Sequence, residues 1–121
     1  MANALNWFEI PASDIERAKK FYNQIFEIEL IPMDGMEGYS LGMFPTEDGV
    51  RGGVIQGEGY QPSAEGSLMY LNAGDDLNDV LNRVEAAGGQ VVMPKTDIGE
   101  NGFYAYFIDS EGNRVGLHSM G

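Results

Sequence analysis

The stretch NWFEIPASDIERAKKFYNQIF, from Asn6 to Phe26, contains an alternating strand, a polar turn and an amphipathic helix in one continuous run. The alternation gives the strand two faces, with Phe8 and Ile10 on one and Trp7 and Glu9 on the other. We expect the apolar pair to lie under the helix, so that the second pair points away from it.

The helix in this stretch has one apolar stripe, whose members recur at the spacing of helical turns. They are Ile15, Ala18, Phe21, Tyr22, Ile25 and Phe26. Ser13 followed by Glu16 is typical of a capping box, in which two side chains satisfy free backbone N–H groups. The sequence therefore predicts a helix that starts near Ser13 and buries one side.

The same strand-to-helix unit occurs a second time as MYLNAGDDLNDVLNRVEAAGG, from Met69 to Gly89. Its acidic start, Asp75-Asp76, suits a helix N-terminus, and Gly88-Gly89 suits a left-handed stop. Its apolar stripe consists of Leu77, Val80, Leu81, Val84 and Ala87. A unit that is used twice indicates a duplicated architecture with two helices of similar length.

Further strands complete each unit. We expect them at residues 27–33, 39–44 and 50–56 in the first half, and at 90–94, 103–108 and 114–118 in the second, with turn chemistry at 34–38 and a polar loop at 96–102. The predicted fold class is therefore α+β, with two tandem βαβββ modules in a single domain spanning 1–121. Module one covers about 4–56, a connector covers 57–66, and module two covers about 67–119.

The composition restricts the partners. The chain has 121 residues and a formal net charge of -12, which repels phosphate backbones and anionic membrane surfaces. Nucleic acid and membrane partners are therefore not expected. No apolar run approaches the ~20 residues of a membrane span, and Met1 to Leu5 has no signal-peptide pattern. With no Cys, the expected protein is soluble and cytoplasmic.

Four motifs in this order resemble those of the vicinal oxygen chelate superfamily, which includes glyoxalase I, bleomycin-resistance proteins and extradiol dioxygenases. They are the strand FEIP, the helix pattern DxxRAxxFY that begins at Asp14, the helix DDLNDVLNRVEAAGG and the closing hairpin FIDSEGNRVGL. The resemblance covers nearly the whole chain. It implies a curved sheet, or half-barrel, built from the two modules around a small-molecule cleft, which is commonly completed in a homodimer.

In metal-using members of this superfamily, one His or Glu from each of four strands holds a divalent ion. Carried over by the motifs, these positions fall at Trp7, Met69 and Gly116, with the fourth near Gly53. None of these residues supplies an oxygen or imidazole ligand. The resemblance therefore implies that the usual metal site is absent, and no metal or other cofactor is expected.

Alternation in the closing strand indicates what lines the cleft instead. Val115 and Leu117 form an apolar face that a helix would cover, so Arg114, Gly116 and His118 point into the cleft. Which residues of 103–108 join them is left open by the sequence. The candidate ligand-binding residues are Trp7, Met69, Gly53, Arg114 and Gly116.

Glu9 and His118 are the candidate catalytic residues, as an acid/base pair within the cleft. They could equally form a structural contact, or belong with a third carboxylate to a displaced metal site. Trp7 could stack on a flat ligand or simply fill the volume that a metal would occupy. Met69 could likewise be core filler, and Gly53 could allow close approach of a ligand or of a partner strand.

Three functions follow from these alternatives. The first is a metal-free member of the superfamily that binds a small organic molecule, with or without turnover. The second is a metal-dependent lyase, isomerase or dioxygenase of the glyoxalase type, if the register of the strands is shifted. The third is an acidic interaction module without a ligand. The identity of the small molecule is not encoded in any recognisable motif.

Overall fold

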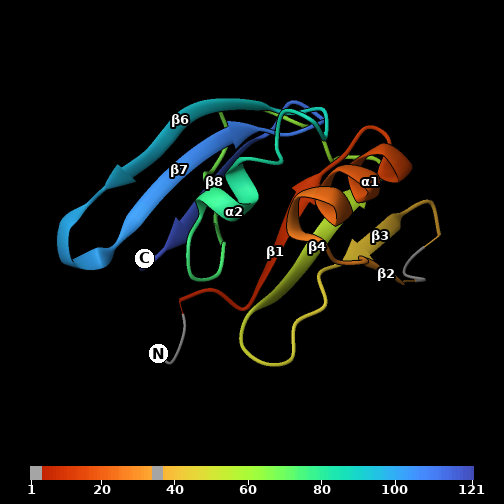
Figure 1. Cartoon of the computed structure of the whole chain (residues 1–121). Helices are drawn as coiled ribbons and strands as arrows, with labels where there is room; N and C mark the ends of the chain where they lie inside the picture. The colour runs from red at the N-terminus through yellow and green to blue at the C-terminus, as the bar shows by residue number, and fades with distance from the viewer. Residues whose placement is uncertain (1–3, 34–36) are drawn as a thin grey trace.

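The computed structural model describes residues 4–33 and 37–121, so part of the expected turn at 34–38 lies outside the described residues. Module one contains β1 (Trp7–Pro11), α1 (Ile15–Phe26), β2 (Ile31–Met33), β3 (Ser40–Met43) and β4 (Arg51–Gln56). Module two contains β5 (Tyr70–Asn72), α2 (Asn78–Leu81), β6 (Gln90–Asp97), the short 3₁₀ helix η1 (Gly99–Asn101), β7 (Phe103–Ile108) and β8 (Arg114–Ser119). Figure 1 shows the two modules side by side.

The two modules have the same strand topology, which confirms the predicted α+β fold. Sheet A has the order β1-β4-β3-β2, and sheet B has the order β5-β8-β7-β6. In each sheet the first strand runs parallel to the last strand of its module, and the remaining pairs are antiparallel. The result is two four-stranded mixed sheets rather than a closed barrel.

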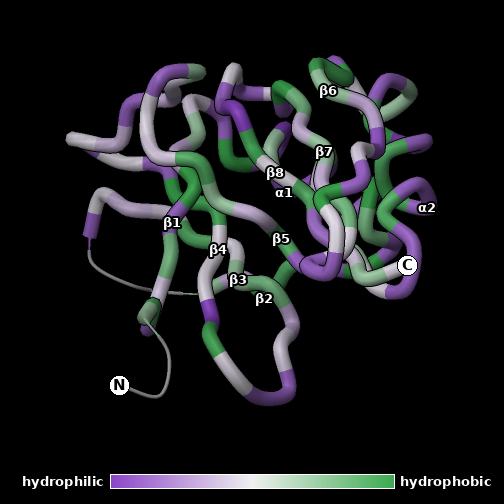
Figure 2. Tube along the Cα trace, turned by 90° about the vertical axis from the view of Figure 1, so that its left-hand side faces the viewer, coloured by the Kyte–Doolittle hydropathy of each residue, from purple (hydrophilic) through white to green (hydrophobic). Residues whose placement is uncertain are grey.

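The two modules share one hydrophobic core. Helix α1 covers sheet A, where Ile10 and Val54 are fully buried, as the alternation in β1 predicts. The same helix contacts module two, because the Phe21 ring lies 5.8 Å from the ring of Phe107. Hydrophobic stretches follow the strands of both sheets in Figure 2, whereas the outer turns are largely hydrophilic. Neither module therefore completes its core alone.

The start of α1 differs from the expected capping box. Asp14, not Ser13, is the N-cap, and its carboxylate accepts a hydrogen bond of 3.1 Å from the backbone N–H of Arg17. A capping-box Glu16 would have to reach back to the N–H of Ser13. That N–H is already bound to Glu111 at 2.8 Å, so a carboxylate from module two replaces the local one.

The second helix is much shorter than expected. Asp76 accepts from the N–H of Asn78 at 2.9 Å, in line with the acidic start, but α2 ends at Leu81. Beyond it, backbone bonds such as Val84 N to Leu81 O span three residues, which is turn geometry rather than α-helix. Leu77, Leu81 and Val84 are nevertheless buried, so the predicted apolar stripe is confirmed although the predicted helix length is wrong.

Strand β6 is longer than its pattern indicated. It continues to Asp97 and pairs with β7 across two shifts in register. The expected polar loop at 96–102 is therefore shorter and consists mainly of η1. Among the described residues, no helix is long and apolar enough to cross a membrane.

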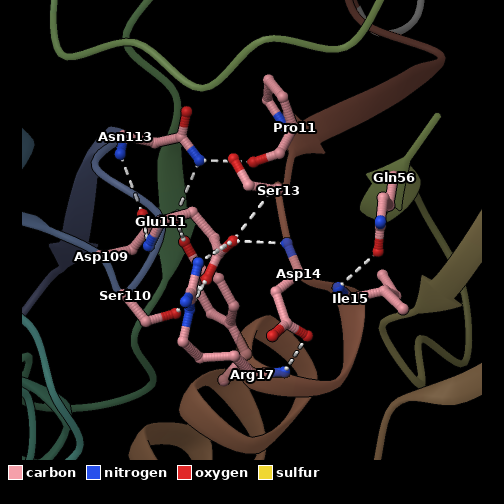
Figure 3. A network of polar contacts seen from close by, with 11 residues as sticks. Pro11, Ser13, Asp14, Ile15, Arg17, Gln56, Asp109, Ser110, Glu111 and Asn113 are labelled. Carbon is pink, nitrogen blue, oxygen red and sulfur yellow. Dashed lines mark hydrogen bonds and ion pairs between the residues drawn. The ribbon is translucent and has the colours of Figure 1, made fainter. Parts of the chain in front are cut away.

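A polar clasp joins the two modules at the start of α1 (Figure 3). It is formed by the β7–β8 turn, residues 109–113. In this turn the Asn113 side chain donates to the Pro11 carbonyl at 2.7 Å, and the Asp109 carboxylate accepts from the Tyr22 hydroxyl at 2.7 Å. The clasp therefore connects the closing hairpin of module two to the first strand and helix of module one.

Candidate functional site

Each sheet has one face that points away from the shared core, here called its open face. In sheet A, strand register pairs Trp7 with Arg51, and Glu9 with Gly53. Because paired residues share a face, these four lie on the open face, opposite buried Ile10. The predicted orientation of the first strand is therefore confirmed.

Glu9 is held by two donors, one from its own strand and one from the connector. Trp7 Nε1 donates to Glu9 Oε2 at 3.2 Å, and the Tyr60 hydroxyl donates to Glu9 Oε1 at 2.7 Å. The hydrogen bond to Glu9, together with burial, raises the pKa of Tyr60 above its ordinary value. Both carboxylate oxygens thus have internal partners, and Glu9 anchors the connector to β1.

Tyr60 was not among the candidates, because nothing in the connector composition signals a role. Its ring lies 5.9 Å from that of Tyr39, in an edge-to-face arrangement. Tyr39 in turn lies against Gly57, where an added Cβ would come within 2.0 Å of the Tyr39 ring. The two tyrosine rings extend an aromatic wall beside Glu9.

The open face of sheet B is richer in aromatic side chains. Register pairs Gly116 with Tyr70 on one side and Tyr106 on the other, and pairs His118 with Asn72 and Tyr104. The alternate residues of β7, Ala105 and Phe107, are fully buried in the core. The question left open by the sequence is thereby answered: Tyr104 and Tyr106 lie on the open face.

Gly116 lies at the centre of this aromatic surface. A Cβ at that position would come within 2.4 Å of the Tyr70 ring, so the ring lies directly over bare backbone. The Tyr70 and Tyr104 rings are 6.1 Å apart, and those of Tyr104 and Tyr106 are 6.3 Å apart. The absence of a side chain at Gly116 therefore lets three tyrosines form one continuous surface.

Arg114 borders the same surface. Its guanidinium carbon lies 5.2 Å from the centre of the Tyr106 ring, which is a cation–π contact. Its Nε is buried and makes no hydrogen bond to any of the described residues. Buried polar atoms without a partner are uncommon in folded proteins. Among the described residues, the Nε of a cation held against an aromatic ring is thus left without an acceptor.

His118 and Glu9 are not hydrogen-bonded to each other. His118 Nε2 lies 2.6 Å from the carbonyl oxygen of Asn101, and because a carbonyl only accepts, Nε2 carries the proton in this contact. The two candidate catalytic residues lie on the open faces of different sheets, each engaged with its own neighbours. A catalytic role for either residue stays a prediction.

The position on β5 that was expected at Met69 is occupied by the next residue, Tyr70. The Met69 side chain packs against the core, and Tyr70 takes the place on the open face opposite Gly116. Met69 instead lines an apolar hollow of about 970 Å³ between the modules, together with Phe8 and Phe44. The expectation that Met69 faces the same side as Gly116 is wrong.

A second hollow, of about 880 Å³, lies at one end of the open face of sheet B. Tyr70, Asn72 and His118 form one side of it, and the chain end at Met120 and Gly121 contributes the other. It is the part of the open face where a small molecule could contact aromatic, amide and imidazole groups together.

The donor set does not fit the divalent ion that metal-using superfamily members hold. Of the central open-face residues, Gly53 and Gly116 have no side-chain ligand atom, and Tyr70 offers only a phenol hydroxyl. Glu9 is the one carboxylate there, and its oxygens accept from Trp7 and Tyr60. Across residues 4–33 and 37–121 no three His, Cys, Asp or Glu side chains are grouped so as to hold a metal ion.

Comparison with known proteins gives a consistent family. The model of the Glyoxalase/Bleomycin resistance protein/Dioxygenase superfamily matches residues 4–117. The glyoxylase-type protein CFP32 of Mycobacterium tuberculosis is 32% identical over 93% of this chain, which spans only 44% of that protein. A glyoxylase-like domain-containing protein of Didymella fabae is 30% identical, over 90% of this chain and 88% of its own length.

Solved structures share the fold. A glyoxalase/bleomycin resistance protein from Streptomyces sp. CB03234 superimposes with a TM-score of 0.70 at 27% identity, covering 96% of this chain and 100% of that one. The family-model match, residues 4–117, contains module one, the clasp and all of module two up to the last two residues of β8. The chain belongs to the glyoxalase/bleomycin resistance protein/dioxygenase superfamily.

Proposed function

We propose that this protein binds a small organic molecule on the open face of sheet B, without a metal ion held by its own side chains. The observation that carries the proposal is the surface of Tyr70, Tyr104 and Tyr106 around Gly116. Aromatic rings beside bare backbone offer flat apolar contact and let a ligand approach closely. Binding sites in proteins combine such surfaces with a few polar groups.

A homodimer is part of the proposal. The open side of sheet A carries large apolar side chains that are substantially exposed, among them Trp7 at 40%, Ile31 at 42% and Met33 at 40%. A second copy of the chain would remove this apolar area from water and would enclose the neighbouring open faces. Light scattering coupled to size-exclusion chromatography is expected to give twice the chain mass, and a monomer at micromolar concentration would contradict this part. The expected compartment remains the cytoplasm.

Metal-dependent chemistry of the glyoxalase type is the competing function. The fosfomycin resistance protein FosX of Listeria innocua matches at 20% identity over 98% of this chain. That distant likeness does not carry the activity across, and the donor set described above argues against a coordinated ion. The competing function therefore serves as an outcome of the test.

The test combines metal analysis with ligand mapping on the full chain. Protein purified without chelators is analysed for Ni, Zn, Mn and Fe, and assayed with the hemithioacetal of methylglyoxal and glutathione. In parallel, a set of mono- and bicyclic aromatic compounds is screened by ¹H–¹⁵N correlation spectra. Trp7 is the one Trp of the chain, so its fluorescence reports separately on sheet A.

The expected result is a substoichiometric metal content and saturable shifts of the amides of Gly116 and its neighbours in β5 and β7. A stoichiometric metal with hemithioacetal turnover would overturn the proposal in favour of the metal-dependent enzyme. Failure of every compound to shift these amides would overturn it in favour of an interaction module. A Gly116→Leu variant, in which the bare backbone is covered, is the control that must lose the shifts.

A further inference from the structure

We infer that Arg114 selects the ligand, and that the open face of sheet B takes a flat organic monoanion, with a carboxylate against Arg114 and an unsaturated body on the tyrosines. This inference rests on the proposed function, because it specifies what the same surface binds. It follows from the ion pairs that the other Lys and Arg side chains make or lack, from the unsatisfied Nε of Arg114, and from the shape of the surface beside Arg114.

Most of the cations in this acidic chain have a carboxylate partner. Ion pairs join Arg17 to Glu111, Lys19 to Glu16, Arg83 to Glu27 and Lys95 to Asp76. Within the described part of the chain Lys20, Arg51 and Arg114 have none, and of these only Arg114 has a buried side-chain nitrogen without a hydrogen-bond partner. This buried, unsatisfied nitrogen is therefore the feature to explain.

The residues that strand register places beside Arg114 carry no negative charge. Register places Ile108 of β7 beside it, followed by Gln90 of β6, and its guanidinium lies over Tyr106. The overall charge of -12 disfavours anions at long range, but at physiological salt a distance of ~8 Å is enough to screen it strongly. An uncompensated cation on an aromatic surface is thus a local site for an anion.

The same protein shows how an arginine of this kind holds a carboxylate. Arg17 donates to Glu111 side-on, through Nε at 2.7 Å and Nη2 at 3.0 Å. A ligand carboxylate that approached Arg114 in this way would give its orphaned Nε an acceptor. Because Nε is covered in the free protein, the guanidinium moves outward from Tyr106 as the anion binds. A single arginine neutralises one charge, which favours a monoanion over a phosphate dianion.

The rest of the ligand is defined by the tyrosines. Beside Arg114, bare backbone at Gly116 leaves a level gap bordered by the rings of Tyr70 and Tyr106. A planar, unsaturated body fits such a gap better than a branched or bulky one, because stacking contact needs two flat surfaces. A flat body with one carboxylate therefore matches both halves of the surface.

The test uses naphthalene-2-carboxylate and its uncharged amide as probes of equal shape. Dissociation constants are measured by ¹H–¹⁵N titration of the wild-type protein and of Arg114→Gln, Arg114→Lys and Arg51→Gln. Arg51 is the matched control, because it stands two residues before Gly53 as Arg114 stands two residues before Gly116, and it removes the same charge from an open face.

We expect the wild type to bind the carboxylate about fivefold to tenfold more tightly than the amide. The expected ratio is kept this low because solvent weakens an ion pair at a partly exposed site. Arg114→Gln is expected to abolish the preference, Arg114→Lys to keep part of it, and Arg51→Gln to leave it unchanged. Equal binding of both probes by the wild type, with shifts at Gly116, would overturn the inference and leave the proposed function standing. No shift with either probe would overturn both, and an equal loss in Arg51→Gln would reduce the effect to overall charge.

Discussion

Arg17 and Glu111 form a side-on pair across the boundary between the modules, with Nε to Oε2 at 2.7 Å and Nη2 to Oε1 at 3.0 Å. The same carboxylate accepts from the backbone N–H groups of Ser13 and Asp14, at 2.8 and 2.9 Å. The Glu111 side chain is only 1% exposed, whereas Arg17 is 53% exposed. Glu111 therefore takes the place of the capping-box carboxylate, is supplied by the other module, and binds the backbone N–H of the N-cap Asp14.

Glu111→Gln is expected to lower the free energy of unfolding by about 2 kcal/mol, because a charged acceptor of several hydrogen bonds becomes a neutral amide that cannot accept them all. The value is kept low since Arg17 is largely in water. Urea denaturation at pH 7 gives the measurement. Glu85→Gln, at an exposed position, is the control and should change stability by less than about 0.5 kcal/mol. Equal loss in both variants would contradict a capping role for Glu111.

The contribution of Glu111 should disappear in acid. Burial opposes ionisation of its carboxylate, but the hydrogen bonds from Arg17, Asp14, Ser110 and Ser13 together outweigh it, so the pKa of Glu111 lies below its ordinary value. A group with a depressed pKa in the folded state stabilises the fold above its unfolded pKa, and this stabilisation is lost as the pH falls through the folded pKa.

The difference in unfolding free energy between the wild type and Glu111→Gln should therefore be constant from pH 7 to about pH 5. It should narrow below about pH 4.3, the ordinary value for glutamate. Denaturant titrations at several pH values between 3 and 7 provide the measurement. A difference that stayed constant down to pH 3 would show that the carboxylate charge does not carry the effect.

The fold of module one could be predicted because independent local signals agree there. Strand alternation at Phe8 and Ile10 and the apolar stripe of α1 all indicate one buried side, and the structure buries it. The cap of α1 could not be predicted, since a local Ser13–Glu16 pattern competes with Glu111, which arrives from a turn almost a hundred residues later. Local patterns cannot rank a partner that only the fold brings close.

The site was less predictable for two physical reasons. In FYAYFI, residues 103–108, both faces are apolar or aromatic, so alternation provides no polar signal to separate Tyr106 from Phe107. The second reason is a register difference between the modules. Ala12 and Ala73 are equivalent, since each donates to a carbonyl of the last strand of its module, Ile55 or His118.

Two positions separate Ala12 from Asp14, whereas three separate Ala73 from Asp76. Aligning the modules on these aspartates therefore shifts β5 by one residue. A shift of one residue in a strand exchanges its two faces. This is why Met69 was expected on the open face, where Tyr70 lies.

The hydroxyl of Tyr22 should contribute measurably to the contact between the modules. It donates to Asp109 Oδ2 at 2.7 Å, and both residues are buried. Burial, followed by the charge of Asp109, raises the pKa of Tyr22 well above its ordinary value, so the hydroxyl stays protonated as a donor. Tyr22→Phe leaves a buried carboxylate oxygen with one donor fewer.

We expect Tyr22→Phe to lower the free energy of unfolding by about 1–3 kcal/mol, as for other buried acceptors that lose a partner. Thermal and urea unfolding monitored by circular dichroism give the measurement. Tyr104→Phe is the matched control, because Tyr104 lies on the open face and its hydroxyl makes no hydrogen bond to the described residues. A comparable loss in the control would mean that the removed hydroxyl, rather than the bond to Asp109, sets the cost.

The two open-face glycines should respond differently to the same substitution, although they occupy equivalent positions. At Gly53 an added Cβ would come within 2.3 Å of the backbone oxygen of Gly42, which cannot move without disturbing the pairing of β3 and β4. At Gly116 it would meet the ring of Tyr70, which is 48% exposed and can rotate away. Backbone crowding should therefore cost more than side-chain crowding.

Gly53→Ala is expected to lower the free energy of unfolding by about 2–3 kcal/mol, within the range for overpacked sites. Gly116→Ala should cost less than about 1 kcal/mol. Combining Gly116→Ala with Tyr70→Ala should remove that smaller cost, since the three atoms nearest to the added Cβ all belong to the Tyr70 ring. A double-mutant cycle measures this coupling. Equal costs for the two glycine variants, or no coupling between Gly116 and Tyr70, would mean that Tyr70 does not lie over Gly116 in solution, and the aromatic surface proposed to bind ligand would lose its central contact.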